Sequence, residues 1–308
     1  MSLIEVKDLS MTFQAGPPWA RRAVHALRNI NLSIAEGEVI GLVGESGSGK
    51  STLGNIMIAR MLATSGVVTY NGEPLHPKDR RKRAGKFAAV LQHPKWSLNP
   101  MLKVSESIIE PLKILGQAGG DKEQNRVVGA ALEQVGMPPS YQDRYPHELS
   151  GGQRQRVSIA RALVTKPEFV LFDEAVSALD VSVQAQVLNL IKSLQADVGF
   201  SALFISHDLA ATRYVASRIA VLYAGQLVED APANSFYGLA AHPYSQGLQY
   251  ASALIDNDDA ELKIGQVDLT TEGCPLVQRC SKATSLCQTK PIEIKTKAHN
   301  HHVACHHI

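Results

Sequence analysis

The run from Gly44 to Ser51 reads GESGSGKS, and it limits what this chain can be more than any other feature. It matches G-x-x-x-x-G-K-[ST], the loop that wraps the phosphates of a nucleotide. Its glycines let successive backbone N–H groups turn inward as a nest for an anion, and the positive end of the following helix adds to that nest. The lysine can reach the β- and γ-phosphates, and the next hydroxyl can ligate Mg²⁺. The chain is therefore predicted to bind a nucleoside triphosphate through Gly44, Glu45, Ser46, Gly47, Ser48, Gly49, Lys50, Ser51 and Thr52, with Ser51 also a Mg²⁺ ligand.

The residues around the loop suit that role. The apolar run 38–43 predicts a buried strand that feeds the loop, and the pattern over 51–61 predicts the helix that leaves it. Strands alternating with helices indicate a parallel sheet covered on both faces. Further strands are predicted at 4–6, 67–70, 87–91, 169–172, 202–206 and 219–223, and helices within 104–135 and at 182–194.

Composition excludes several classes of protein. A formal net charge of +2 is too small to indicate a nucleic-acid partner. No apolar stretch reaches the roughly 18 residues of a spanning helix, and no signal peptide opens the chain. We expect a cytoplasmic protein that acts on a membrane only through partners.

Two acidic residues end the apolar run 169–172. A strand of this kind places Asp173 at the carboxyl edge of the sheet, where it can hold the Mg²⁺ shell. Glu174 follows, in a position to polarise an attacking water as general base. Acidic pairs on a protein surface rarely follow four apolar strand residues, so we predict that both are functional.

A second glycine nest opens a helix at residues 149–156, LSGGQRQR. It is a second predicted anion site, because a glycine-rich turn precedes a helix N-terminus there as well. Two such sites in one chain are hard to explain if one subunit alone binds each nucleotide.

These motifs, in this order, resemble those of the ATP-binding-cassette (ABC) family over roughly residues 3–235. Four segments resemble family motifs: residues 44–51 resemble the Walker A motif, 170–174 the Walker B motif, 149–153 the signature motif and 177–180 the D-loop. Three single residues also match in position. Gln92 corresponds to the glutamine of the Q-loop, His207 to the switch histidine, and Phe13 to the aromatic residue that stacks on adenine. Two residues depart from the family pattern: Ala175 where relatives usually have proline, and His93 where they often have aspartate. Neither departure removes a catalytic group.

The resemblance implies a head-to-tail dimer, with ATP between the Walker motifs of one subunit and the signature residues of the other. Those signature residues are Ser150, Gly151, Gly152 and Gln153. Glu174, His207 and Gln92 form the implied catalytic set: His207 contacts the γ-phosphate, and Gln92 senses Mg²⁺ and relays to the membrane partner.

Residues 97–100, 180–186 and 242–244 resemble the peptide and nickel importers within the family. Among these the chain is similar to the second of the two paired ATPases of a dipeptide- or oligopeptide-permease. The resemblance implies two membrane permeases, a sibling ATPase that forms a heterodimer, and a periplasmic or extracellular substrate-binding protein. It places the chain on the cytoplasmic face of the plasma membrane.

All four cysteines, Cys274, Cys280, Cys287 and Cys305, lie near the C-terminus. They lack the C-x-x-C pairs of zinc ribbons and the usual ferredoxin runs, so spacing alone leaves an iron–sulfur cluster, zinc and plain buried thiols open. Their surroundings resemble the C-terminal extension of peptide-permease ATPases, which implies a 4Fe–4S cluster on the four thiolates. Histidines 299, 301, 302, 306 and 307 are expected to form an exposed tail that attracts metal ions.

The expected fold is α/β: a P-loop nucleotide-binding core with an antiparallel β subdomain, a helical subdomain with the signature helix, and a small Cys-rich C-terminal appendage. We expect a nucleotide-binding domain at 1–235 and an extension at 236–308. The expected function is ATP hydrolysis that drives peptide import, with import of a nickel or other metal chelate, or of another small solute, as the alternative. If the chain were an ABC ATPase of DNA repair, we would expect a long coiled-coil or zinc-bearing insertion. If it were ribosome-associated, we would expect two cassettes. The sequence has no such insertion and only one cassette.

Overall fold

The computed structural model describes residues 2–17, 19–79, 81, 83–91, 98–253, 273–298 and 300–308. The chain forms two compact units, each assembled from separate segments. Unit 1 comprises 35–38 and 76–205, and unit 2 comprises 2–34, 39–75 and 206–308. The Q-loop residue Gln92, the neighbouring His93, and His299 lie outside the described residues.

Unit 2 contains the strand that feeds the phosphate loop. Strand β3 (Val39–Val43) is buried along its whole length and pairs in parallel with β9 (Arg218–Tyr223). Strand β9 pairs antiparallel with β10 (Gln226–Pro232), β10 with β12 (His301–Ala304), and β12 with β11 (Ile294–Ala298). The sheet in this unit therefore runs β11-β12-β10-β9-β3.

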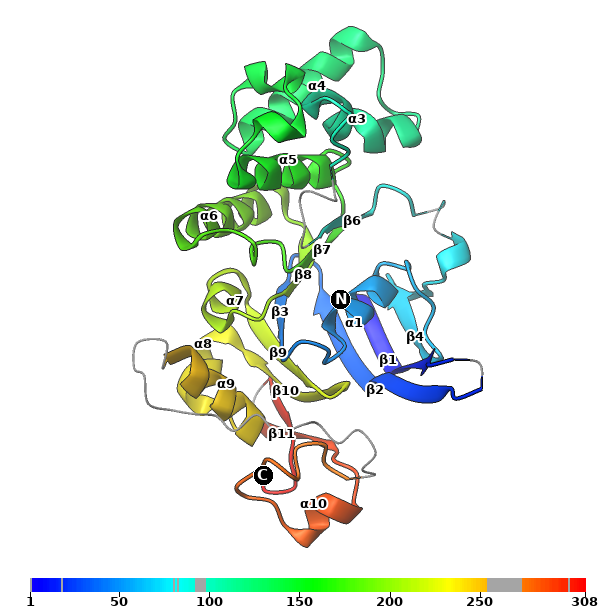
Figure 1. Cartoon of the computed structure of the whole chain (residues 1–308), viewed down its shortest axis with the longest axis vertical. Coiled ribbons are helices and arrows are strands. Elements are labelled where there is room, and N and C mark those ends of the chain that lie inside the picture. Colours follow the sequence, from blue (N-terminus) through cyan, green and yellow to red (C-terminus); the bar gives the residue numbers. More distant parts are fainter. Residues whose placement is uncertain are drawn as a thin grey trace. The chain divides into compact units, whose positions relative to one another are not determined.

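A second, antiparallel sheet of unit 2 has the order β2-β1-β4-β5. Its strands are β1 (Ser2–Ala15), β2 (Arg22–Ala35), β4 (Ser65–Tyr70) and β5 (Glu73–Pro74). In β2 the buried residues Ile30, Leu32 and Ile34 alternate with exposed ones, the pattern of a strand with one face on a core. The expected antiparallel β subdomain is thus present (Figure 1).

Helix α1 (Lys50–Met57) begins at the phosphate loop and ends earlier than the predicted residue 61. Ala59 adopts a left-handed φ of 56°, its N–H donates to the Ile56 carbonyl at 2.9 Å, and the N–H of Arg60 donates to Asn55 at 2.8 Å. This pair of hydrogen bonds is the Schellman ending of a helix, with alanine where glycine is usual. The remaining helices described in unit 2 are α7 (Leu209–Val215), α8 (Ala233–Leu239), α9 (Pro243–Ala253) and α10 (Ser285–Thr289).

Unit 1 combines parallel strands with a group of helices (Figure 1). Strand β7 (Phe169–Asp173) pairs in parallel with β6 (Phe87–Val90) and β8 (Ser201–Ile205). The helices α3 (Val104–Ile114), α4 (Asp121–Gln134) and α5 (Gly151–Leu163) pack on one another, and α5 also contacts α6 (Val181–Val198). Short 3₁₀ helices lie at η1 (Pro77–Asp79), η2 (Pro139–Asp143) and η3 (Pro146–Glu148). The expected helical subdomain with the signature helix is α3, α4 and α5.

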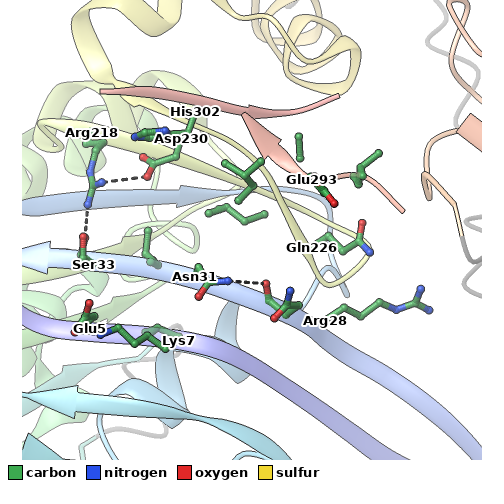
Figure 2. Close-up of a pocket in the computed structure, with 17 residues that line it drawn as sticks. Glu5, Lys7, Arg28, Asn31, Ser33, Arg218, Gln226, Asp230, Glu293 and His302 are labelled. Carbon is green, nitrogen blue, oxygen red and sulfur yellow. Dashed lines mark hydrogen bonds and ion pairs between the residues drawn. The ribbon is translucent and has the colours of Figure 1, made fainter. Parts of the chain in front are cut away.

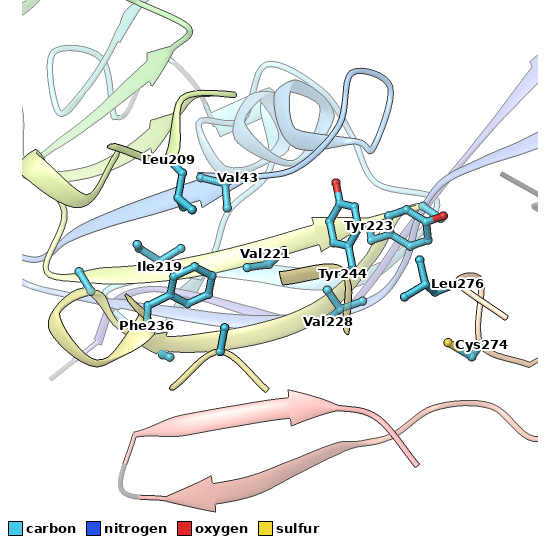
Figure 3. Close-up of a cluster of buried hydrophobic side chains, with 14 of the residues drawn as sticks. Val43, Leu209, Ile219, Val221, Tyr223, Val228, Phe236, Tyr244, Cys274 and Leu276 are labelled. Carbon is cyan, nitrogen blue, oxygen red and sulfur yellow. The ribbon is translucent and has the colours of Figure 1, made fainter. Parts of the chain in front are cut away.

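The C-terminal segment is part of the core of unit 2 rather than an appendage. Strand β12 extends the sheet through β10. Cys274, Leu276 and Cys287 are buried in one apolar cluster with Tyr223 and Phe236 (Figure 3). The structure therefore does not support the expected small Cys-rich appendage, because hydrogen bonds and apolar contacts join this segment to the sheet. The division at residue 235 stays a prediction.

Within the described ranges, no helix is long and apolar enough to cross a membrane.

Candidate functional site

The phosphate loop needs glycine where the sequence has it. Gly44, Gly47 and Gly49 have φ values of 154°, 79° and 105°, which side chains other than glycine rarely adopt. A Cβ on Gly44 would lie 2.1 Å from the carbonyl oxygen of Leu222, and one on Gly49 would lie 2.4 Å from that of Ala26. The loop therefore combines left-handed backbone with close packing against two neighbouring segments.

The side chain of Lys50 bonds to backbone carbonyls of the phosphate loop. This side chain is buried, and the ammonium Nζ donates hydrogen bonds to the carbonyls of Gly44 and Glu45, both at 2.8 Å. These bonds hold the positive charge at the centre of the loop, at the first residue of α1. A compact cation beside a helix N-terminus suits phosphate oxygens.

Ser48 adds a polar atom to the same loop. Its Oγ is buried and has no hydrogen-bond partner among the described residues. A buried hydroxyl without a partner is costly unless a ligand supplies one. The loop thus offers an unsatisfied hydroxyl, glycine backbone and a buried cation together, a combination that fits a nucleotide's phosphates.

The His242-Pro243-Tyr244 motif supports this loop. The buried carboxylate of Glu229 accepts hydrogen bonds from the N–H groups of Ala241 and His242, at 2.8 and 3.0 Å. The N–H of Tyr244 donates to His242 Nδ1 at 3.2 Å, and the Tyr244 hydroxyl accepts from the N–H of Glu45 at 2.9 Å. The sequence marked this motif only by resemblance; its contact with Glu45 was not foreseen.

His301 completes the network and corrects an expectation. It is buried, and its Nε2 lies 2.7 Å from the Glu229 carboxylate. His301 therefore does not belong to an exposed, metal-attracting tail; the ring packs inside unit 2 because β12 pairs with β10. His302 and His306 are partly buried and His307 is exposed.

Two other predicted residues lie in unit 2. Phe13, on β1, is 37% exposed and so is not one of the fully buried core residues. His207 is exposed and lies two residues after the end of β8. Its neighbours are fixed: Ser206 donates from its N–H to Leu42 at 3.3 Å and accepts at Oγ from the N–H of Asp208 at 3.0 Å. The roles in adenine stacking and γ-phosphate contact stay predictions.

The Walker B residues lie in unit 1. Strand β7 is buried up to Asp173, which is partly buried. Glu174 has a left-handed φ of 49°, its N–H donates to Ile205 at 2.9 Å, and its carbonyl accepts from Ser177 Oγ at 2.9 Å. Non-glycine residues held in this conformation cluster at functional sites. Ala175, where relatives usually have proline, is 3% exposed and packs in the core.

The signature residues begin α5. Ser150 Oγ accepts from the N–H of Gln153 at 3.2 Å, while Gln153 Oε1 accepts from the N–H of Ser150 at 3.0 Å, which forms a capping box. A Cβ on Gly152 would lie 2.4 Å from Val183 Cγ1, so this glycine permits close packing against α6. A pocket of about 280 Å³ borders Ser150, Gly152 and Gln153.

The D-loop ends as a helix cap. Asp180 Oδ1 accepts from the N–H of Val183 at 3.0 Å and from Ser182 Oγ at 2.8 Å. These two hydrogen bonds hold the pKa of the Asp180 carboxyl below its usual range. Asp180 therefore stays ionised at the N-terminus of α6, where a negative charge is favourable.

A larger pocket of unit 2, of about 510 Å³, is lined by none of the residues predicted to bind or hydrolyse the nucleotide (Figure 2). It lies between β1 and β2 on one side and β10, β12 and the approach to β11 on the other. Arg218 crosses it, with an ion pair to Asp230 at 3.0 Å and a hydrogen bond to the carbonyl of Ser33. These contacts join the two sheets of unit 2.

The four cysteines are free thiols, and all but the half-buried Cys280 are buried. Burial, together with the neighbouring thiols, raises the pKa of Cys274 to about 11. Cys287 Sγ lies 3.5 Å from Nε2 of His307. Among the described residues, no group of three or more His, Cys, Asp or Glu side chains is arranged to hold a metal ion. The structure therefore supports neither the predicted 4Fe–4S cluster nor a Cys-rich metal-binding appendage.

Each unit gathers part of the predicted site. Unit 2 holds the phosphate loop, Phe13 and His207, and unit 1 holds Asp173, Glu174 and the signature residues. Sequence reasoning did not predict Glu229, which binds the backbone of Ala241 and His242 and lies far along the chain from the loop that they support. No local pattern marks this residue.

Comparison with known proteins agrees with the resemblance of the motifs to the ABC family. The sequence profile of the ABC transporter family matches residues 27–177. The oligopeptide transport ATP-binding protein OppF of Bacillus subtilis (strain 168) is 45% identical over 86% of this chain and 87% of its own length. The protein YkfD of the same strain, whose name assigns it provisionally to oligopeptide transport as an ATP-binding protein, is 41% identical over 99% of this chain and 95% of its own length.

A solved structure also aligns closely. The ATP-binding cassette MJ0796, in a dimeric post-hydrolysis state bound to ADP and Pi, superposes with a TM-score of 0.66 and 30% identity. The alignment covers 75% of this chain and 98% of that one. With its Walker A loop in place and relatives that match over nearly its full length, the chain belongs to the ABC transporter family.

Proposed function

We propose that this chain is the ATP-hydrolysing subunit of an importer that carries peptides across the cytoplasmic membrane. The observation that carries the ATPase assignment is the phosphate loop, in which buried Lys50 bonds to Gly44 and Glu45 at the start of α1. The peptide assignment is supported by OppF and YkfD, both named for oligopeptide transport. Nickel or other metal chelates remain the alternative cargo.

Residues of the chain divide the work of hydrolysis as follows. The loop from Gly44 to Thr52 binds the phosphates, and Phe13 stacks on the adenine. Ser51 and Asp173 supply oxygen ligands of the kind that Mg²⁺ prefers, with Gln92 as a further ligand. Bound Mg²⁺ neutralises charge on the phosphates.

Glu174 acts as general base toward the attacking water. The backbone of Glu174 is hydrogen-bonded to Ile205 and Ser177, and these bonds support that role because they fix the position of Glu174. His207 contacts the γ-phosphate, and Ser150, Gly151, Gly152 and Gln153 bind the nucleotide of the facing subunit. The dimer of ATPase subunits closes when ATP binds and reopens after hydrolysis, and these two states can drive the permeases.

The proposed partners are two membrane permeases, a sibling ATPase in a head-to-tail heterodimer, and a substrate-binding protein. The dimeric form of the similar cassette MJ0796 supports the pairing. The proposed location is the cytoplasmic face of the membrane, held there by the permeases. Purification of the tagged chain from membranes tests this: permeases should co-purify with it, whereas co-purification of nucleic acid or ribosomes alone would contradict the importer assignment.

The 4Fe–4S cluster remains a prediction of the family resemblance. It needs four thiolates, and the chain has four cysteines in one segment. Iron, sulfide and zinc analysis of anaerobically purified protein decides the matter. About four irons per chain with matching sulfide would establish the cluster; zinc or no metal would remove it and leave the ATPase assignment unchanged.

A further inference from the structure

An arginine of the C-terminal segment contacts the phosphate loop. Arg279 Nη2 lies 3.1 Å from Glu45 Oε1, and its Nη1 lies 3.4 Å from Glu45 Oε2. The Arg279 and Glu45 side chains are only 11% and 29% exposed. The two planar groups thus meet as a fork in a sheltered position, where ion pairs are screened less than on an open surface.

Aromatic residues hold this pair in place. Arg279 Nη1 also donates to the Tyr223 hydroxyl at 3.1 Å, while the Tyr244 hydroxyl accepts from the N–H of Glu45 at 2.9 Å. The rings of Tyr223 and Tyr244 lie 4.4 Å apart, beside Leu276 (Figure 3). Glu45 is therefore fixed through both its backbone and its carboxylate.

The base of Arg279 is rigid as well. Its N–H donates to Leu276 at 2.9 Å, and Leu276 is buried in the apolar cluster. Nearby, the N–H of Cys274 donates to the Cys287 carbonyl at 2.8 Å, and a Cβ on Gly273 would lie 2.3 Å from that carbonyl oxygen. The segment that carries Arg279 is thus tightly packed, so the guanidinium is presented to the loop from a fixed support.

The charge of Glu45 makes this contact matter for nucleotide binding. Glu45 directly follows Gly44, and its carbonyl accepts a hydrogen bond from Lys50. A free carboxylate in a loop that binds a triphosphate repels the ligand, and it competes for the lysine. A guanidinium that pairs with the carboxylate cancels this charge and fixes the loop before the nucleotide arrives.

We propose that Arg279 is a positioning residue for the phosphate loop, which neutralises Glu45 and thereby makes nucleotide affinity depend on the C-terminal segment. This inference rests on the proposed binding of ATP at the loop. It assigns the segment after residue 273 a role in the ATPase site that does not require a metal.

Four variants of the full chain test the proposal by titration with a fluorescent ATP analogue. Arg279→Ala should weaken binding about three- to tenfold, because the Glu45 charge is then uncompensated. Arg279→Lys should keep most of the affinity. Glu45→Gln, itself a change in the binding loop, serves only as the reference: Arg279→Ala combined with Glu45→Gln should bind as Glu45→Gln does and more tightly than Arg279→Ala alone, since coupled residues are not additive.

Arg218→Ala is the matched control. Arg218 forms an ion pair of similar shelter in the same unit, at 3.0 Å from Asp230, without touching the loop. It should lower the thermal unfolding temperature without changing nucleotide affinity. In the assembled complex, Arg279→Ala should raise the KM for ATP more than it lowers kcat.

Two results would overturn the proposal: unchanged affinity in Arg279→Ala, or a double variant that binds as weakly as Arg279→Ala alone. If Arg279→Ala does not fold, Arg279→Gln, which removes the charge but keeps a polar side chain, takes its place in both comparisons. A wild-type chain that binds no nucleotide would refute the proposed function itself, and the inference with it.

Discussion

The backbone N–H of Glu174 donates to the carbonyl of Ile205 at 2.9 Å and holds Glu174 in a left-handed conformation at the end of β7. The bond ties the residue proposed as general base to the end of the neighbouring strand β8. Because Ser177 binds the carbonyl of Glu174 as well, the position of the residue is fixed from two sides.

Glu174→Gln should therefore keep this backbone geometry and remove only the basicity. We expect ATP binding to be retained and turnover to fall by about 10²- to 10⁴-fold, the usual contribution of a general base. Hydrolysis measured in the assembled complex checks this. Glu168→Gln, just before the same strand and paired on the surface with Lys86 at 3.0 Å, is the control and should hydrolyse normally. Near-normal turnover by Glu174→Gln would remove Glu174 as the base.

Lys50→Ala should abolish the charge at the centre of the loop together with its bonds to Gly44 and Glu45. Charge-assisted hydrogen bonds are the strong ones, so we expect at least a roughly tenfold loss of affinity for the ATP analogue. Lys86→Ala is the control: it removes a lysine whose side chain is 48% exposed, and it should leave the affinity for the ATP analogue unchanged. Equal affinities in the two variants would show that Lys50 does not contact the phosphates.

Gly49→Ala and Gly72→Ala separate backbone strain from steric clash. Both glycines have positive φ, 105° and 80°, so each substitution costs about 1–2 kcal/mol of left-handed strain. Only at Gly49 does the new Cβ meet a backbone oxygen, that of Ala26 at 2.4 Å; at Gly72 nothing lies within 4 Å. We expect Gly49→Ala to lose about 1–3 kcal/mol more in free energy of unfolding, measured by urea titration. Equal losses would mean that the loop can shift to admit the methyl group.

Buried His242 should make stability depend on pH. Burial lowers the pKa of its imidazole from 6.5 to about 4, and the ring Nδ1 accepts a hydrogen bond from the backbone N–H of Tyr244 at 3.2 Å. The unfolded chain binds the proton more tightly, so this contribution is complete above about pH 6.5 and is lost as the pH falls toward 4. The full effect is about 3 kcal/mol, at 1.36 kcal/mol per pKa unit.

His242→Asn tests that dependence, since an amide oxygen can replace Nδ1 as acceptor from Tyr244 but does not titrate. The variant should show a flatter free energy of unfolding between pH 4 and 6.5 than the wild type. Parallel curves for the two proteins would show that another group governs acid stability.

Local sequence was sufficient for the parts of the fold that depend on short-range pattern. The strand β3, the glycine loop and the strand β7 with its two acids were confirmed within one residue, because an apolar run and its punctuation are local. The end of α1 was predicted four residues too late, since the left-handed turn at Ala59 uses a residue with no preference for it.

What sequence could not supply is long-range pairing. Glu45 meets Arg279, which follows it by 234 residues, and Glu229 meets His301 across 72 residues. Charged and aromatic residues of these types are common on surfaces, and only the pairing of β12 with β10 buries His301. Local pattern accordingly predicts a small C-terminal appendage, whereas β12 pairs with β10 and Cys274 and Leu276 pack into the apolar cluster of unit 2.

The central claim is that this chain uses ATP to drive peptide import, and one measurement tests it most directly. The complex of the chain with its permeases and sibling ATPase is placed in vesicles with the substrate-binding protein, and ATP hydrolysis is followed with and without peptide. We predict hydrolysis that peptide stimulates in the wild type and that Glu174→Gln abolishes. Two results would contradict the account: a rate of ATP hydrolysis that peptide does not change but a metal chelate raises, or no hydrolysis at all.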